Sequence, residues 1–218
     1  MTIERNVDRI LRELPPGVGL VAAAKSAPPQ AVLEAVQAGA KTIGENYVQE
    51  AQEHRRLVGG AACWHFIGRL QKNKAKKAVS LFDMIETIDS MDIAREVDRR
   101  STEAGRVMPV LIELNSGREA QKAGILPEDA ASVISEIAKL KNIRVMGLMT
   151  MGPRSGDPEE SRSYFVATRK IFDTLKKLDL PEVEMKYLSM GMSNSYKIAL
   201  EEGANIVRIG SKIFGERA

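Results

Sequence analysis

The sequence predicts an α/β protein, a single (β/α)8 TIM-type barrel with an extra N-terminal helix, formed by residues 1–218 as one domain. The first observation behind this prediction is an alternation of apolar strand-like runs and amphipathic helical segments, which continues along the whole chain. The second is that the strand-like runs are nearly continuously apolar, as in parallel strands that helices cover. The third is length, because 218 residues can hold eight such units. An open doubly wound sheet is the rival architecture, and length alone does not exclude it.

The first segment, residues 2–14, places its apolar side chains on one helical face, and Pro15–Pro16 end that helix. Ser90 is a candidate N-cap for one later helix, and Gly203 a candidate left-handed cap for another. The segment GPRSGDP, residues 152–158, is the one stretch that resembles a mobile linker. The predicted strands are 17–24, 42–47, 63–68, 84–89, 107–114, 144–151, one that ends near 188, and 206–209. The predicted helices between them are 30–38, 48–57, 70–79, 91–105, one from 127 onwards, 159–178 and 195–202.

Composition and charge indicate an ordinary globular protein. A hydrophobic fraction of 44% can form a packed core, and a net charge of +3 is too small to indicate nucleic acid as a partner. The only cysteine, Cys63, excludes an internal disulfide and fits a reducing compartment. No segment is apolar for long enough to span a membrane, and the N-terminus lacks the apolar core of a signal peptide. We therefore expect a cytoplasmic protein with no membrane partner.

The stretch 188–215 contains the best candidate binding site in the chain. Two successive strand ends are rich in small residues that let a ligand approach the backbone closely. In TIM barrels a phosphate group frequently binds at the loops after strands seven and eight, which are these two turns. Arg208 lies inside the second of the two strands, and a buried charge there needs a partner. The small residues of the two turns are Ser189, Gly191, Ser193, Gly210 and Ser211. Harmless packing is the alternative explanation for turns of this kind.

Lys25 is the candidate nucleophile. It ends the first apolar strand, so in a barrel it lies at the same end as the two small-residue turns. A desolvated lysine has a lowered pKa, which an amine needs to attack an aldehyde. The alternative is a lysine that marks the end of the strand in solvent.

Other polar residues give weaker signals. His65, within an aromatic strand, is expected to be a packing residue, and His54 is expected in solvent on a polar helix face. Cys63 is expected to pack within its strand, and histidine and cysteine are too few for a zinc cluster. The basic segment 69–77 is compatible with an RNA-binding, anion-binding or protein-binding surface, or with a solvated helix face.

Several motifs together resemble the pyridoxal phosphate homeostasis proteins, which are single-domain barrels related to the N-terminal domain of bacterial alanine racemases. The motifs are Lys25 after an apolar strand, GENYVQEA at 44–51, WHFIGRLQKNK at 64–74, and SMGMS and VRIGSKIFG within 189–215. The resemblance implies pyridoxal 5′-phosphate (PLP) bound as a Schiff base on Lys25. It places the other cofactor contacts at Asn46, Met149, Ser193, Arg208, Gly210 and Ser211, with Lys122 near the mouth of the barrel.

Two departures from the family pattern concern the rim of the site. Asn194–Ser195 stand where acidic residues are usual, and Ser26–Ala27 where a threonine and a bulkier residue are common. Neither departure removes a cofactor contact, but the resemblance does not extend to the rim of the site or to any surface that binds a partner.

The implied function is intracellular PLP homeostasis, as a carrier or regulator. A ring nitrogen that faces Arg208 stays unprotonated, which weakens carbanion chemistry. Racemisation also needs a second acid or base, which in the related racemases is a tyrosine from an added domain. The alternative is a PLP-dependent amino-acid racemase or a related enzyme. We expect a monomer whose partners are PLP and apo forms of PLP-dependent enzymes.

Overall fold

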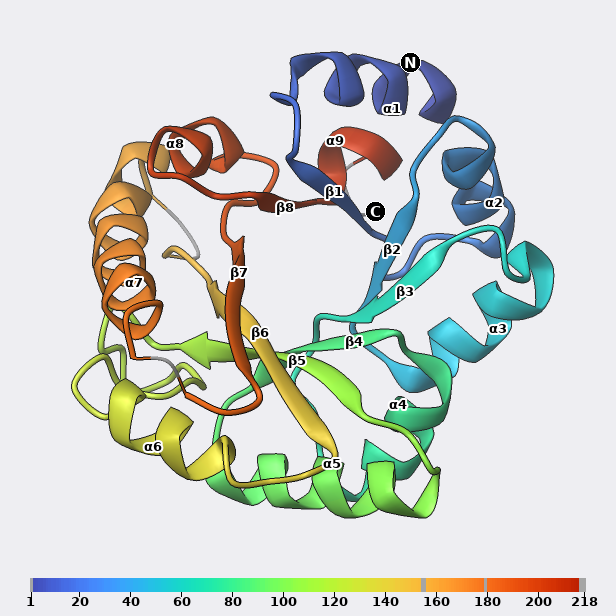
Figure 1. Ribbon diagram of the computed structural model, residues 1–218. Coiled ribbons are helices and arrows are strands. Elements are labelled where there is room, and N and C mark those ends of the chain that lie inside the picture. Colours follow the sequence, from blue (N-terminus) through green and yellow to red (C-terminus); the bar gives the residue numbers. More distant parts are fainter. Residues whose placement is uncertain (1, 154–155, 179, 216–218) are drawn as a thin grey trace.

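Eight parallel strands close into one barrel in chain order, with each strand hydrogen-bonded to its neighbours and β8 to β1 (Figure 1). The computed structural model describes residues 2–153, 156–178 and 180–215. Closure confirms the predicted TIM-type barrel and excludes the open sheet. The strands are β1 (Gly19–Ala23), β2 (Thr42–Glu45), β3 (Cys63–Phe66), β4 (Met84–Ile88), β5 (Met108–Leu114), β6 (Ile143–Thr150), β7 (Val183–Ser189) and β8 (Ile206–Ile209).

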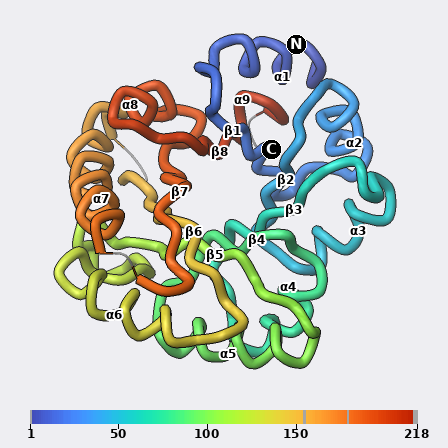
Figure 2. Tube along the Cα trace, viewed as in Figure 1, coloured from blue at the N-terminus to red at the C-terminus, as the bar shows by residue number. Residues whose placement is uncertain are grey.

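Helices surround the barrel, as the ribbon and the Cα trace both show (Figures 1 and 2). The helices are α1 (Ile3–Glu13), α2 (Pro29–Gln37), α3 (Val48–Val58), α4 (Ala75–Leu81), α5 (Met91–Glu103), α6 (Ala130–Ile137), α7 (Ser161–Leu175), α8 (Tyr196–Glu201) and α9 (Ser211–Phe214), with short 3₁₀ turns η1 (Lys72–Lys74) and η2 (Pro158–Glu160). The single helix predicted for 70–79 is thus η1 followed by α4. Of the predicted linker 152–158, positions 154–155 lie outside the described residues.

The extra N-terminal helix exists as predicted. Val7 and Ile10 on one side of α1 are fully buried, and the Thr2 side chain accepts a hydrogen bond from the backbone N–H of Arg5 at the start of the helix. Helices α1 and α9 lie side by side (Figure 2). Asn6 donates a hydrogen bond from its side chain to the carbonyl of Ile213 at 3.0 Å, which connects the two helices. Helices α1 and α9 therefore pack against each other beside the paired strands β1 and β8.

Two predicted helix ends are confirmed. The Ser90 hydroxyl accepts a hydrogen bond from the backbone N–H of Ile93 at 3.4 Å, as an N-cap does. Gly203 follows α8 with φ +88°, the left-handed conformation that glycine adopts without steric cost.

The core has two parts. The larger part fills the layer between the strands and the helices, and a smaller cluster of Met84, Leu111 and Met149 lies apart from it. Because strand residues contribute to both, most strand positions are committed to packing. The positions left for chemistry are those near the carboxyl ends of the strands.

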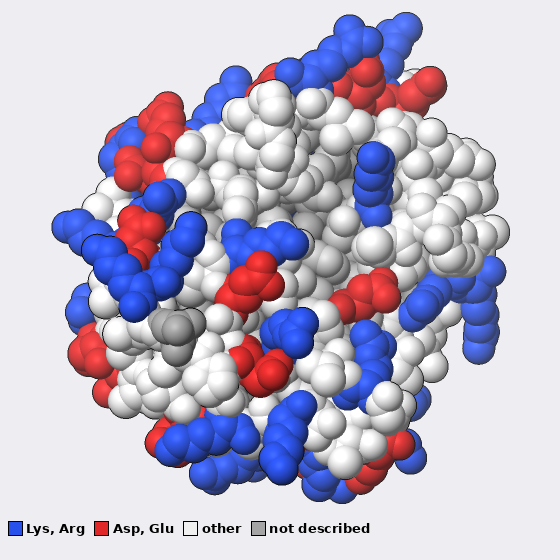
Figure 3. Space-filling view, viewed as in Figure 1, with Lys and Arg blue, Asp and Glu red and all other residues white. Residues whose placement is uncertain are grey.

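On the face shown in Figure 3, Lys and Arg lie beside Asp and Glu around the rim, so no broad field of positive charge covers this face. Within the described part of the chain, no helix is both long and apolar enough to cross a bilayer.

Candidate cofactor-binding site

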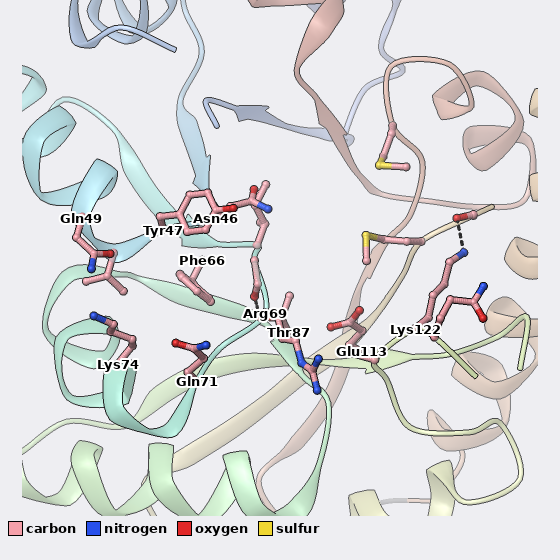
Figure 4. Close-up of a pocket in the computed structure, with 18 residues that line it drawn as sticks. Asn46, Tyr47, Gln49, Phe66, Arg69, Gln71, Lys74, Thr87, Glu113 and Lys122 are labelled. Atoms are coloured by element: carbon pink, nitrogen blue, oxygen red, sulfur yellow. Dashed lines mark hydrogen bonds between the residues drawn. The ribbon is translucent and has the colours of Figure 1, made fainter. Parts of the chain in front are cut away.

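A cavity of about 520 Å³ opens where the strands end (Figure 4). Its lining residues follow or end successive strands, because the carboxyl ends of parallel strands meet at one end of a barrel. The lining consists of Asn46, Tyr47, Val48, Gln49, Phe66, Ile67, Gly68, Arg69, Gln71, Lys74, Thr87, Glu113, Gln121, Lys122, Ala123, Met151, Gly152 and Met192.

Lys25 lies in a tight turn directly after β1, closed by a hydrogen bond from the backbone N–H of Ala27 to the carbonyl of Ala24 at 2.8 Å. Its side chain is half-buried, and its Nζ lies 5.8 Å from the centre of the Tyr47 ring, which lines the cavity. Among the described residues, no carboxylate forms an ion pair with Lys25. Its amine is therefore available to a ligand.

The predicted phosphate-binding residues Ser193, Gly210 and Ser211, here called the cradle, come together at the ends of β7 and β8. The Ser193 hydroxyl accepts hydrogen bonds from the backbone N–H groups of Gly210 at 3.2 Å and Lys212 at 3.5 Å. A Cβ at Gly210 would lie 3.1 Å from the carbonyl oxygen of Ala23. A side chain at position 210 would crowd the end of β1, so the cradle adjoins the turn of Lys25.

Arg208 is buried inside the barrel and has the partners that a buried charge requires. Its Nη1 donates to the Ser189 carbonyl at 3.0 Å and to the Ser189 hydroxyl at 2.6 Å, and its Nη2 donates to the Thr150 carbonyl at 2.9 Å. Burial lowers the pKa of the guanidinium, and the carboxylates of Glu86 and Glu113 oppose that effect. These three bonds use three of the five guanidinium N–H donors, and among the described residues the Nε–H and the second Nη2–H have no acceptor, so they are left for a ligand.

A buried polar chain, which the sequence did not reveal, holds Arg208 in place. Glu86 accepts a hydrogen bond from the Ser189 hydroxyl at 2.6 Å, contacts His65 Nδ1 at 2.6 Å and lies 3.8 Å from Arg208. Burial alone would raise the pKa of Glu86, but the hydrogen bond and charge of His65 and the charge of Arg208 outweigh it and hold that pKa below its usual range. His65, expected to be a packing residue, belongs to this polar chain instead.

Glu113 brings a second buried carboxyl group to the cavity, where Figure 4 shows it pointing toward the open centre. It is 4% exposed, and within the described part of the chain its side chain has no hydrogen-bond partner. Burial, followed by the charge of Asp89, raises the pKa of Glu113 to about 7, against the opposing charges of Arg208 and Arg69. This carboxyl group is therefore poised to exchange a proton near neutral pH.

The remaining predicted residues occupy different places. Asn46 lines the cavity, whereas Met149 is fully buried in the small core cluster, and Met151, directly after β6, is the methionine that reaches the cavity wall. Lys122 also lines the cavity, where it donates from Nζ to the carbonyl of Gly152 at 2.9 Å (Figure 4).

The prediction that His54 lies in solvent is wrong. Its side chain is buried, because position 54 is in phase with Val48, Ala51 and Val58 on the inner face of α3. His54 Nδ1 contacts Glu45 Oε1 at 2.6 Å inside the protein.

Glu45, Glu86 and Glu113 were missed by the sequence analysis, although each lies within a predicted strand. The argument applied to Arg208, that a charge in an apolar strand needs a partner, applies equally to these glutamates. Among the described residues no cluster of His, Cys, Asp and Glu is suited to a metal ion.

The available donors fit a ligand that carries an aldehyde, a phosphate and an aromatic nitrogen. Lys25 supplies an uncommitted amine, the cradle supplies the proton of the Ser193 hydroxyl and the backbone N–H of Ser211, and Arg208 Nε supplies a donor for the nitrogen. PLP carries these three groups together.

Comparisons with known proteins agree with this chemistry. Residues 1–218 match the family described as alanine racemase, N-terminal domain. The pyridoxal phosphate homeostasis protein of Aquifex aeolicus is 40% identical over 199 residues, which cover 91% of this chain and 86% of that protein. The PipY protein of Synechococcus elongatus, whose structure has PLP bound, is 33% identical with a TM-score of 0.90, over 98% of this chain and 100% of that one.

A more distant likeness is to the alanine racemase of Clostridium difficile, at 17% identity and a TM-score of 0.79, over 99% of this chain and 56% of the racemase. That likeness shows the barrel fold alone. The match to the family over the whole chain and the identity to its curated members give the assignment: the chain belongs to the pyridoxal phosphate homeostasis protein family, within the alanine racemase N-terminal domain group.

Proposed function

We propose that this protein binds PLP through Lys25 and acts in intracellular PLP homeostasis as a carrier or regulator. The observation that carries the proposal is the position of Lys25, whose amine has no carboxylate partner among the described residues and whose turn adjoins the cradle. The relatives named for PLP homeostasis and the PLP-bound PipY structure support it.

PLP supplies an aldehyde that condenses with a primary amine and a pyridine ring that can withdraw electrons. In our proposal Lys25 is that amine. The Ser193 hydroxyl and the backbone N–H of Ser211 hold the phosphate, and the N–H of Gly210 keeps the Ser193 hydroxyl in place beside them. Asn46 completes the surroundings of the ring at the cavity wall, whereas Met149 packs behind it in the small core cluster. Arg208 only donates hydrogen bonds, so it leaves the ring nitrogen unprotonated and the ring a weak electron sink. Glu86 and Ser189 keep Arg208 in this orientation.

Titration with PLP tests the role of Lys25. The parent protein should develop a visible absorption band that saturates, whereas Lys25→Ala should develop none and bind PLP at least about tenfold more weakly. Lys41→Ala is the matched control, because Lys41 is exposed and precedes β2, at the opposite end of the barrel. Equal affinity and an equal band in Lys25→Ala would reject the assignment of Lys25.

A PLP-dependent amino-acid racemase or related enzyme is the second candidate function. One observation favours it: Glu113 faces the cavity, and burial followed by the charge of Asp89 raises its pKa to about 7, suited to proton transfer. Incubation with L-alanine in deuterated water would decide. Rapid exchange of the α-proton that Glu113→Gln abolishes would favour the enzyme, and no exchange would favour the carrier.

We also propose that residues 1–218 act as one domain and as a cytoplasmic monomer that passes PLP to apo forms of PLP-dependent enzymes. Cys63 is free and exposed, so the expectation that it packs within its strand is wrong, but a free cysteine still supports a reducing compartment. A role in RNA binding for segment 69–77 is disfavoured, since Lys72 pairs with Asp92 at 2.7 Å and Arg69 with Asp89 at 3.7 Å. These acids reduce the positive charge available to phosphates.

A further inference from the structure

The turn that carries Lys25 has an unfavourable backbone conformation. Ser26, the residue after Lys25, has φ +62°, in the left-handed region that costs free energy for any residue with a side chain. Such a conformation persists only where the surrounding structure holds it in place. The contacts that hold this turn therefore decide where Lys25 points.

Two side chains of α3 supply those contacts. Glu50 Oε2 accepts a hydrogen bond from the backbone N–H of Ser26 at 3.1 Å, and His54 Nε2 lies 3.0 Å from the carbonyl oxygen of Ala27. Glu50 and His54 are four residues apart, so they lie on the same face of the helix. Helix α3 thus contacts the backbone of both residues that follow Lys25.

The bond from His54 depends on protonation. The carbonyl of Ala27 can only accept a hydrogen bond, so His54 Nε2 must carry a proton for this bond to form. The other ring nitrogen, Nδ1, lies 2.6 Å from Glu45 Oε1, and a bond between these two atoms also needs a proton. Both bonds therefore exist together only while His54 and Glu45 share a proton in addition to the one on Nε2.

Loss of the shared proton leaves neutral His54 beside the ionised, fully buried Glu45. The remaining ring proton then moves to Nδ1, since Glu45 is the charged acceptor, and the bond from Nε2 to Ala27 is lost. Glu45 Oε2 is buried and has no partner among the described residues, so nothing else there compensates the carboxylate.

The charged groups that face His54 are Glu45 from β2 and Glu50 from α3 itself. Burial would lower the pKa of His54, but the hydrogen bond and charge of Glu45, the Ala27 carbonyl and the charge of Glu50 together raise it. Burial raises the pKa of Glu45, against the opposing effect of His54. Both shifts favour the protonated forms, so the pair holds its shared proton to a higher pH than either group would alone, and the two groups titrate as a unit.

We propose that Glu45, Glu50 and His54 form a latch that positions Lys25, and that loss of the proton shared by Glu45 and His54 loosens the turn and speeds exchange of the bound cofactor. This proposal rests on the proposed binding of PLP to Lys25. The three latch residues are positioning residues, since they act on Lys25 through the backbone of the turn.

Isotope exchange on the loaded, full-length protein tests the latch. Protein carrying unlabelled PLP is mixed with excess deuterated PLP at several values between about pH 6 and pH 9, quenched with borohydride, and the Lys25 peptide is analysed by mass. The parent should exchange about tenfold faster at the top of this range than at the bottom. His54→Gln removes the imidazole whose Nε2 proton holds Ala27, so the part of the pH dependence that the latch contributes should be lost and its profile should be clearly flatter than that of the parent.

The second arm uses a matched pair on α3. Glu50→Ala should exchange about tenfold faster than the parent at every pH while keeping the pH dependence, because the bond to Ser26 is lost and the pair of His54 and Glu45 is intact. Glu53→Ala, an exposed position on the same helix, should match the parent.

A His54→Gln profile that superimposes on the parent profile would overturn the latch, as would equal rates in Glu50→Ala and Glu53→Ala. If His54→Gln fails to fold, the comparison of exchange rates between Glu50→Ala and Glu53→Ala still tests the latch. If the parent carries no adduct on Lys25, the proposed function fails. If the adduct forms but its exchange rate does not change in the latch variants, only the latch proposal fails.

Discussion

Replacing Glu86 with alanine tests whether the buried polar chain holds the site together. The substitution removes the acceptor of the Ser189 hydroxyl at 2.6 Å and the partner of His65 at 2.6 Å, and it leaves Arg208 buried without the carboxylate 3.8 Å away. Removing one partner of a buried ion pair costs about 3–5 kcal/mol, because the other charge stays buried and uncompensated. For a chain of this length we expect the melting temperature to fall by about 6–20 °C, at roughly 2–4 °C per kcal/mol.

Urea denaturation followed by circular dichroism measures this loss. The control is Glu136→Ala, which breaks an exposed pair with Lys139 and should change stability by less than about 1 kcal/mol. A Glu86→Ala variant that unfolds at the same urea concentration as the control would refute the reasoning. It would mean that Arg208 is held by Ser189 and Thr150 alone.

The remaining predictions concern a raised pKa, a tight glycine and the assembly state. Burial, followed by the charge of Asp89, raises the pKa of Glu113 to about 7. The protonated carboxyl group therefore contributes its whole share of the folding free energy below the pKa of the unfolded chain, and this contribution is lost as pH rises toward 7. Glu113→Gln should therefore gain up to roughly 3 kcal/mol over the parent at about pH 8 and little at pH 4, measured by urea denaturation. Gly68→Ala should lose about 1–3 kcal/mol in the same assay, because its Cβ would lie 2.3 Å from the carbonyl oxygen of Asn46; Gly60→Ala, with open space around it, should lose less than about 0.5 kcal/mol. Light scattering should give the monomer mass of 24.0 kDa, and twice that mass would contradict the proposed monomer.

The barrel was predictable because its strands are packed on both faces and its helices on one. That pattern gives continuous apolar runs for the strands and a 3.6-residue period for the helices. Boundaries were less predictable. The basic segment at 70–79 has helical residues throughout, yet Gln71 is extended and the regular helix starts only at Ala75.

The cradle and Lys25 were predictable from sequence order, since strand ends in a barrel meet at one end. Arg208 was predictable as a buried charge that needs a partner, but the sequence did not indicate which groups would be its partners. Glu86 reaches it across the barrel interior from β4, and such a contact depends on strand tilt and register that periodicity does not encode.

His54 shows a different limit. Its neighbours in sequence, Glu53 and Arg55, indicate a polar surface, whereas its helical phase with Ala51 and Val58 places it inside. Phase is the better guide here, because a histidine whose two ring nitrogens both find partners can be buried without an unsatisfied polar atom.

Borohydride reduction of the PLP-loaded protein, followed by peptide mass mapping, tests the central claim most directly. The account predicts that the visible absorption band disappears on reduction and that the pyridoxyl mass is found on the peptide containing Lys25. A pyridoxyl mass on another lysine, such as Lys122 at the wall of the cavity, or no adduct after loading, would contradict the assignment of Lys25 as the residue that holds PLP.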